Sequence, residues 1–141
     1  MRKKACFFGA NSGIAKAVIQ KISNEYDLLL ISRNEKSLEI LSRDIQTRCN
    51  SNVSIIISDL SEISYHEELL AQIKKFSTSY DLMFFAQGTL PNQESCINNP
   101  KEALKEINNN FNSIVSLSWH SEKLLKERGV FAVISSVGRI S

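Results

Sequence analysis

The stretch Lys4-Ala-Cys-Phe-Phe8-Gly9-Ala-Asn-Ser-Gly13-Ile-Ala15 decides how the rest of the sequence is interpreted. Its first part, residues 4–8, is a short apolar run that ends directly at a glycine, which is typical of a buried β-strand. Apolar residues then recur at helical spacing over residues 14–24. The stretch therefore predicts a strand, a glycine-bearing turn and a helix, the opening of a βαβ unit.

The same alternation continues along the chain. Further strands are predicted over residues 27–32, 53–58, 81–85 and 130–134, and further helices over residues 35–49, 64–76 and 99–126. Alternating strands and helices form a parallel sheet that helices cover on both faces. We therefore expect residues 1–141 to form one doubly wound α/β domain of the Rossmann type, with strand order 3-2-1-4-5.

The last predicted helix has a clear start. Asn99 is a favourable N-cap, and Pro100 suits the first helical position. An apolar stripe is expected to face the core through Ala103, Ile107, Phe111, Ile114 and either Leu117 or Ser118. Gly129 is expected to end this segment and release the chain into the fifth strand.

Composition excludes several classes of protein. The chain is 43% hydrophobic, with 17 basic and 15 acidic residues and a formal charge of +2, which does not indicate a nucleic-acid partner. Neither a secretory signal nor a membrane span is predicted, so we expect a soluble, cytoplasmic protein without a membrane partner. Cys6, Cys49 and Cys96 match no disulfide or zinc pattern, His66 and His120 lack partners at ligand spacing, and no metal site is predicted.

The glycine turn has the chemistry of a phosphate site. Ligands of such sheets lie at the carboxyl ends of the strands, where Gly9 permits backbone angles closed to other residues. Gly13, without a side chain, lets a pyrophosphate approach the positive end of the helix. Asn11, Ser12 and Ile14 belong to the same predicted contact. A P-loop is excluded because no Gly-Lys-Ser/Thr follows, whereas an ordinary strand-to-helix turn stays open as an alternative.

The pattern Gly9-x-x-x-Gly13-x-Ala15 resembles the Gly-x-x-x-Gly-x-Gly turn of the short-chain dehydrogenase/reductase family. The resemblance extends over essentially the whole chain. It implies a dinucleotide cofactor, hydride transfer between the nicotinamide and a ketone or alcohol, and a small-molecule substrate. It also implies that the protein could form homo-oligomers.

Ser32-Arg33-Asn34 follows the second strand, where the resemblance places the adenosine ribose. An NAD-preferring site usually has a carboxylate here. Arg33 instead suits the 2′-phosphate of NADP, to which Ser32 could also donate. We therefore predict NADP rather than NAD. The alternative is that Arg33 is a solvated charge at the start of a helix.

Other landmarks of the family follow the later strands. Asp59-Leu60 is similar to the pair that holds adenine, although Asp59 could instead be an N-cap, a role that Ser61 could also perform. Phe85-Ala-Gln-Gly88 falls where the family has Asn-Asn-Ala-Gly. Gly88 matches and would leave space for the ribose and nicotinamide, and Ala86 would border the same site.

Two residues resemble the family's catalytic positions. Asn110, with Asn109 as the one-residue alternative, lines up with the asparagine that holds a water in a proton relay. Ser136, beside Ser135, matches the serine that hydrogen-bonds the substrate carbonyl.

The family's proton donor belongs to a Tyr-x-x-x-Lys motif, in which the lysine lowers the pKa of the tyrosine. Tyr26, Tyr65 and Tyr80 are followed four residues later by leucine, leucine and phenylalanine, so none qualifies. The family's motif lies downstream of the serine. We therefore expect an NADP-binding Rossmann domain that is incomplete at its carboxyl end, truncated after the fifth strand and inactive alone. The alternative is a non-catalytic nucleotide-binding module or an inactive truncated product.

Overall fold

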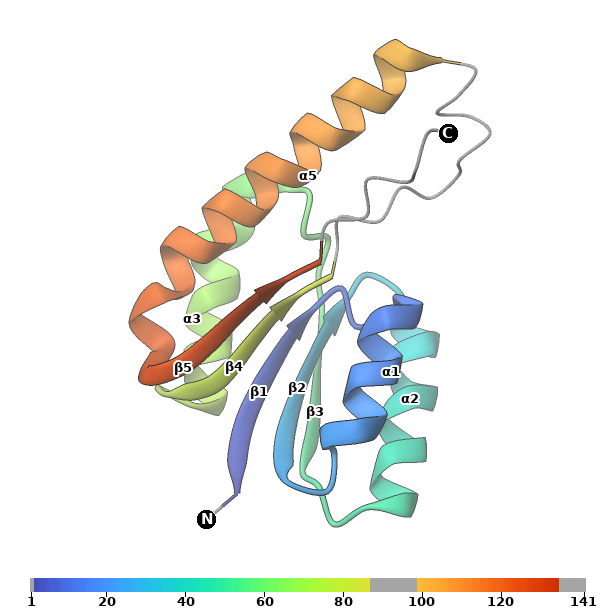
Figure 1. Ribbon diagram of the computed structural model, residues 1–141, viewed down its shortest axis with the longest axis vertical. Helices are drawn as coiled ribbons and strands as arrows, with labels where there is room; N and C mark the ends of the chain where they lie inside the picture. Colours follow the sequence, from blue (N-terminus) through green and yellow to red (C-terminus); the bar gives the residue numbers. More distant parts are fainter. Residues whose placement is uncertain (1, 87–98, 135–141) are drawn as a thin grey trace.

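All five predicted strands are present in the computed structural model, which describes residues 2–86 and 99–134. They are β1 (Lys3–Phe8), β2 (Tyr26–Ser32), β3 (Val53–Ile57), β4 (Tyr80–Phe85) and β5 (Leu125–Val133). All neighbouring strands are parallel, in the order β3-β2-β1-β4-β5 (Figure 1). The predicted fold class and strand order are confirmed.

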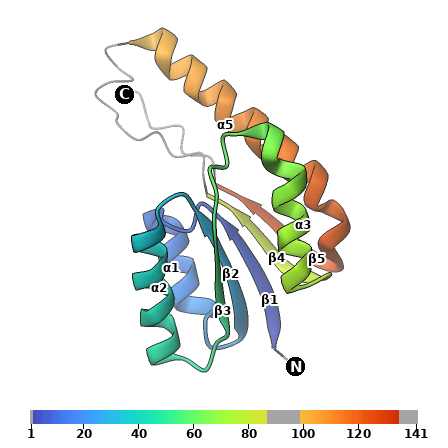
Figure 2. The same cartoon turned by 180° about the vertical axis from the view of Figure 1, so that it is seen from behind.

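Helices cover both faces of this sheet. One face carries α1 (Gly13–Ile22) and α2 (Glu35–Arg48), and the other carries α3 (His66–Phe76) and α5 (Pro100–Ser121) (Figure 2). Short 3-10 turns, Ile63–Tyr65 and Glu122–Leu124, precede α3 and follow α5. Among the described residues, no helix has the length and apolar character needed to cross a membrane.

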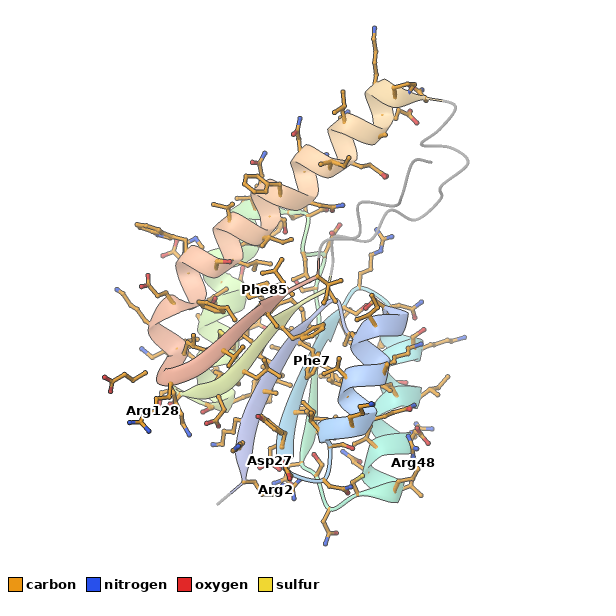
Figure 3. The ribbon with its side chains drawn as sticks, viewed as in Figure 1. Arg2, Phe7, Asp27, Arg48, Phe85 and Arg128 are labelled. Atoms are coloured by element: carbon orange, nitrogen blue, oxygen red, sulfur yellow. The ribbon has the colours of Figure 1, made fainter. Side chains whose placement is uncertain are left out.

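The strand β1 divides the core into two layers. Cys6 and Phe8 face α3 and α5, whereas Ala5 and Phe7 face α1 and α2, and all four are fully buried. Aromatic pairs join β1 to β4 on both faces. The rings of Phe8 and Phe85 are stacked with centroids 4.5 Å apart, and those of Phe7 and Phe84 on the other face are tilted with centroids 5.1 Å apart. Figure 3 labels one ring of each pair, Phe85 and Phe7.

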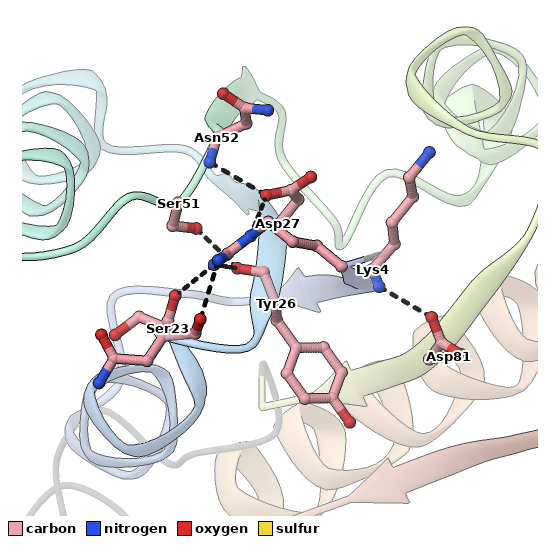
Figure 4. A network of polar contacts seen from close by, with 9 residues as sticks. Lys4, Ser23, Tyr26, Asp27, Ser51, Asn52 and Asp81 are labelled. Atoms are coloured by element: carbon pink, nitrogen blue, oxygen red, sulfur yellow. Dashed lines mark hydrogen bonds and ion pairs between the residues drawn. The ribbon is translucent and has the colours of Figure 1, made fainter.

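Polar contacts hold the amino-terminal end of the sheet together. Arg2 Nε donates to Asp27 Oδ1 at 2.8 Å, and its terminal nitrogens donate to three backbone carbonyls of residues 23–26. The N–H of Asn52 donates to the same Asp27 oxygen, and Ser51 Oγ donates to the carbonyl of Tyr26 (Figure 4). These hydrogen bonds thereby connect the start of β2 to three neighbours: the residue before β1, the residues after α1 and the loop before β3.

The start of α5 is as predicted, but its buried face is not. Asn99 Oδ1 accepts from the N–H of Glu102, and Pro100 is the first helical residue. The predicted stripe was wrong at Ile107 and Phe111, which are 37% and 64% exposed. The amino-terminal half of α5 extends past the ends of the strands, so no sheet lies beneath it (Figure 1). The buried residues of α5 are Ser113, Leu117 and Ser121.

The boundary between α5 and β5 also differs from the prediction. The helix ends at Ser121 rather than near Lys126, and β5 begins at Leu125, so Gly129 lies inside the strand. Tyr80 pairs with Leu125, but Leu82 pairs with Val130, which is a register shift of the bulge type. A Cβ on Gly129 would lie 2.7 Å from Leu125 Cδ1, so the glycine is explained by this irregularity.

Asp81 connects its own strand, β4, to β1 and to β5 at the amino-terminal end of the sheet. Its Oδ2 accepts from the N–H of Lys4 at 2.8 Å, and its Oδ1 lies 3.1 Å from Lys126 Nζ. Burial alone would raise the pKa of Asp81, but the Lys4 N–H and the Lys126 ammonium outweigh this effect and lower it. The carboxylate is therefore stabilised in its charged form by the fold.

We expect Asp81→Asn to lower the free energy of unfolding by roughly 0.5–1 kcal/mol near pH 7, because it removes the charge and keeps the shape. The folded pKa lies below the unfolded value of 3.8, so the stabilisation is present above that pH and is lost as the pH falls through the folded pKa. Urea unfolding followed by circular dichroism at neutral and acidic pH measures the difference.

Asp44→Asn is the matched control, because Asp44 pairs with Arg48 on the surface of α2, where both side chains are half exposed. Its loss should be smaller. If the free energies of unfolding of the unsubstituted chain and of Asp81→Asn differed as much at acidic pH as at neutral pH, this account would be contradicted.

Candidate functional site

The turn after β1 is held against β2 by its backbone. The N–H groups of Gly9 and Ala10 both donate to the carbonyl of Ile31, at 2.9 and 3.0 Å. Gly9 has φ 85°, in the left-handed region that side chains disfavour. The N–H of Ser12 then donates to the carbonyl of Gly9. These hydrogen bonds and the positive φ of Gly9 fix the backbone conformation of the turn, which leads from the end of β1 directly into α1.

The first turn of α1 is open. Ser12 is the N-cap, and its Oγ accepts from the N–H of Ala15 at 3.1 Å. Gly13 and Ile14 are exposed, and N–H groups in a first turn have no acceptor within their helix. A Cβ built on Gly13 meets no atom within 4 Å. This end of α1 can therefore accept an anion against its backbone.

Asn11 links the glycine turn to the end of β2. Its Nδ2 donates to Ser32 Oγ at 2.5 Å, and the N–H of Asn34 donates to the same oxygen at 3.3 Å. Ser32 is 8% exposed. Because its oxygen accepts both bonds, the hydroxyl hydrogen stays available for donation. Within the described residues, Asn11 Oδ1 is buried without a hydrogen-bond partner.

Asp59 forms a turn with Ser61 rather than an N-cap. Its Oδ1 accepts from both Ser61 Oγ, at 2.6 Å, and the Ser61 N–H, at 3.0 Å. The N-cap alternative was wrong for Asp59 and Ser61, because the N-caps of the following helices are Glu62 and Tyr65. The side-chain and backbone hydrogen bonds from Ser61, aided by the charge of Arg33, lower the pKa of Asp59 against a small opposing effect of burial.

A cleft of about 420 Å³ opens where the first three strands end. Six of the predicted positions line it together with the alternative Asn109: Gly9, Ser32, Arg33, Asp59, Leu60 and Asn110. They come from four segments that are far apart in the sequence. The exposed guanidinium of Arg33 and the carboxylate of Asp59 are thus brought to one site.

The other predicted positions lie beside the cleft or outside the described residues. Asn11, Ser12, Gly13 and Ile14 are not lining residues: they follow the lining residue Gly9 in the chain, and Asn11 bonds the lining residue Ser32. Ala86 is 2% exposed, packs in the core against α1 and α2, and donates its N–H to the carbonyl of Phe8. Gly88 and Ser136 lie outside the described residues, so their assignments stay predictions.

Four lining residues were not predicted: Ser58, Ser61, Glu106 and Ser113. Ser58 and Ser61 flank the predicted pair and could have been found by extending it. Glu106 and Ser113 are each one helical turn from Asn109 or Asn110, so helical spacing indicates them once Asn110 is placed.

Comparisons with known proteins agree with the fold. The sequence model of the family described as short chain dehydrogenase matches residues 3–139. A short-chain dehydrogenase from Oenococcus oeni PSU-1 has a similar fold, with a TM-score of 0.83 at 15% identity over 96% of this chain. An oxidoreductase from Escherichia coli has a TM-score of 0.81 at 21% identity over 99% of this chain.

A third similar structure is that of L-sorbose reductase from Gluconobacter frateurii, which is complexed with NADPH and L-sorbose. Its TM-score is 0.72 at 17% identity over 84% of this chain. The chain spans 62%, 60% and 46% of the lengths of these three proteins, in the order given. No curated protein sequence gives a significant match.

We expect Gly9→Ala to destabilise the chain by roughly 1–2 kcal/mol, because an alanine side chain is strained in the left-handed region. Urea unfolding measures the change. Gly13→Ala is the control, since Gly13 is helical and has open space at its Cβ. Equal stability of the chain and Gly9→Ala would show that the turn can adopt another path.

Proposed function

The chain belongs to the short-chain dehydrogenase family, and from that premise we propose that it binds NADP as part of an oxidoreductase. The observation that carries the proposal is the cleft at the ends of β1, β2 and β3, which Gly9, Arg33 and Asp59 line, with the open start of α1 four residues after Gly9. A phosphorylated nucleoside needs a cation for a phosphate, an acceptor for its base and N–H donors for a pyrophosphate, and Arg33, Asp59 and the start of α1 offer these groups in turn.

The pyrophosphate is proposed to lie at the start of α1. The N–H groups of Gly13 and Ile14 supply donors, and the helix dipole favours the negative charge. The absence of a side chain at Gly13 leaves room for close approach. Ser12 already caps the helix, so its hydroxyl serves the geometry of the turn while its backbone borders the anion.

The adenosine half is proposed to lie between the loop after β3 and α5. Asp59 Oδ1 is occupied by Ser61, which leaves Oδ2 as an acceptor for the amino group of adenine. Arg33 would pair with the 2′-phosphate, and no carboxylate stands at residues 32–34 to hold a free 2′-hydroxyl. The NADPH complex of the similar L-sorbose reductase supports the choice of NADP.

When bound, NADPH would supply a hydride for the reduction of a carbonyl substrate. Asn110 is proposed to hold a water beside the reacting groups, and Ser136 is proposed to orient the carbonyl oxygen. Tyr26, Tyr65 and Tyr80 lack a lysine four residues later, so they do not provide the family's proton donor. A nucleotide-binding module without turnover is the second candidate, because the cleft and the open start of α1 would suffice for binding alone.

Replacing Arg33 by alanine tests the choice of cofactor. We expect affinity for NADPH to fall by about 10- to 100-fold, because a charge-assisted pair with the 2′-phosphate is lost, and affinity for NADH to change much less. Fluorescence titration measures both. Lys36→Ala removes an exposed charge at the start of α2 and is the control. Equal losses for the two cofactors in Arg33→Ala would rule out the proposed preference for NADP.

Replacing Gly13 by alanine tests the pyrophosphate site. A methyl group has room in the chain itself, so we expect stability to stay equal or to rise by up to about 1 kcal/mol. The same methyl group would occupy the path of the pyrophosphate, so binding of both NADPH and NADH should be lost. Gln20→Ala, later in α1, is the control. Undiminished binding by Gly13→Ala would place the ligand elsewhere.

A further inference from the structure

A buried histidine joins the two walls of the cleft. His66, the first residue of α3, is 1% exposed. Its Nε2 lies 2.7 Å from the carbonyl oxygen of Leu60, and its Nδ1 lies 2.7 Å from Ser116 Oγ on α5. The carbonyl can only accept, so Nε2 carries the hydrogen, and in that tautomer Nδ1 accepts from the Ser116 hydroxyl.

The same carbonyl has a second donor. Ser113 Oγ, also on α5, lies 2.5 Å from the oxygen of Leu60 and is itself 1% exposed. Both lone pairs of the carbonyl are therefore occupied, one by α3 and one by α5. We call His66, Ser113, Ser116 and the Leu60 carbonyl the histidine clamp.

The histidine clamp lies where α5 leaves the sheet. Ser113 is the first buried residue along α5, and the preceding part of the helix extends past the strand ends (Figure 1). That projecting part carries Glu106, Asn109 and Asn110, which line one wall of the cleft. Asp59 and Leu60, in the loop after β3, form another wall of the same cleft. The clamp is thus a direct polar connection between the two walls.

We propose that His66 is a positioning residue for adenine recognition: by fixing the Leu60 carbonyl against α5, it sets where Asp59 stands relative to the base. This inference rests on the proposed binding of NADP in the cleft. His66 does not itself line the cleft, and it acts through the backbone of Leu60 and the adjoining Asp59.

The preference for one base over another can be measured, and a variant that only destabilised the fold would not change this preference. Asp59 Oδ2 can accept a hydrogen bond from the amino group of adenine. In the hypoxanthine analogue of NADPH, an oxygen replaces that amino group and would face the carboxylate. The ratio of the two dissociation constants therefore reports how well Asp59 is placed, independently of overall affinity.

The experiment compares the 141-residue chain with His66→Leu and His66→Gln, by fluorescence titration with NADPH and with its hypoxanthine analogue. We expect the chain to prefer NADPH by about tenfold, the value of one good hydrogen bond. His66→Leu should reduce the preference to about twofold or less. His66→Gln should restore it, because glutamine can donate to Leu60 and accept from Ser116.

Ser118→Ala is the control and should keep the full preference, since among the described residues the Ser118 hydroxyl bonds only the Ile114 carbonyl of its own helix. If His66→Leu lowers the thermal stability but keeps the preference, the inference is overturned and the clamp is structural only. If His66→Leu does not fold, Ser116→Ala decides: a reduced preference supports the inference, and an unchanged one overturns it.

The outcomes also separate this inference from the proposed function. A chain that binds neither ligand contradicts the proposed function. A chain that binds both ligands equally well retains nucleotide binding but overturns adenine recognition through Asp59, and with it the role of His66. A preference for NADPH that every clamp variant retains overturns the role of His66 alone.

Discussion

The structure depends on the complete burial of residues 5–8 of β1. Both edges of this strand are hydrogen-bonded, to β2 and to β4, and both of its faces are covered by helices. Neither face can hold an unpaired charge, and burial raises the pKa of the Cys6 thiol well above its ordinary value. Residues 5–8 of β1 must therefore be apolar, and the chain can become polar again at the end of the strand only at Gly9.

The same constraint creates the cleft. Parallel strands end at one edge of the sheet, so the residues that follow β1, β2 and β3 arrive side by side although they are far apart in the sequence. Gly9, Arg33 and Asp59 reach the cleft in this way. The chain can therefore keep its core apolar and bring the charged side chains of the cleft together at the carboxyl ends of the strands. At the amino-terminal ends, Arg2 and Asp27 form an ion pair.

The strands were predictable because each contains a run of apolar residues, and their order was predictable from the alternation of strands and helices typical of a Rossmann fold. The glycine turn was predictable because few residues suit its geometry. The end of α5 was not, since Gly129 marks a strand irregularity rather than a helix end. Exposed Phe111 has the spacing of a core residue, and only the position of α5 shows otherwise. His66 has no metal-ligand partner at the usual spacing, and its contacts with Leu60 and with Ser116 on α5 depend on how α3 and α5 pack, which helical spacing alone does not indicate.

The register shift between β4 and β5 has a consequence for how the chain could change during evolution. Residues 126–129 lie between two ladder positions, and their lengthening or shortening would leave the pairing of Val130 with Leu82 in place. Insertions and deletions should therefore accumulate there in homologous chains, while the length of β1 and of its glycine turn stays constant. The sheet would tolerate variation at the irregularity between β4 and β5 and none in β1.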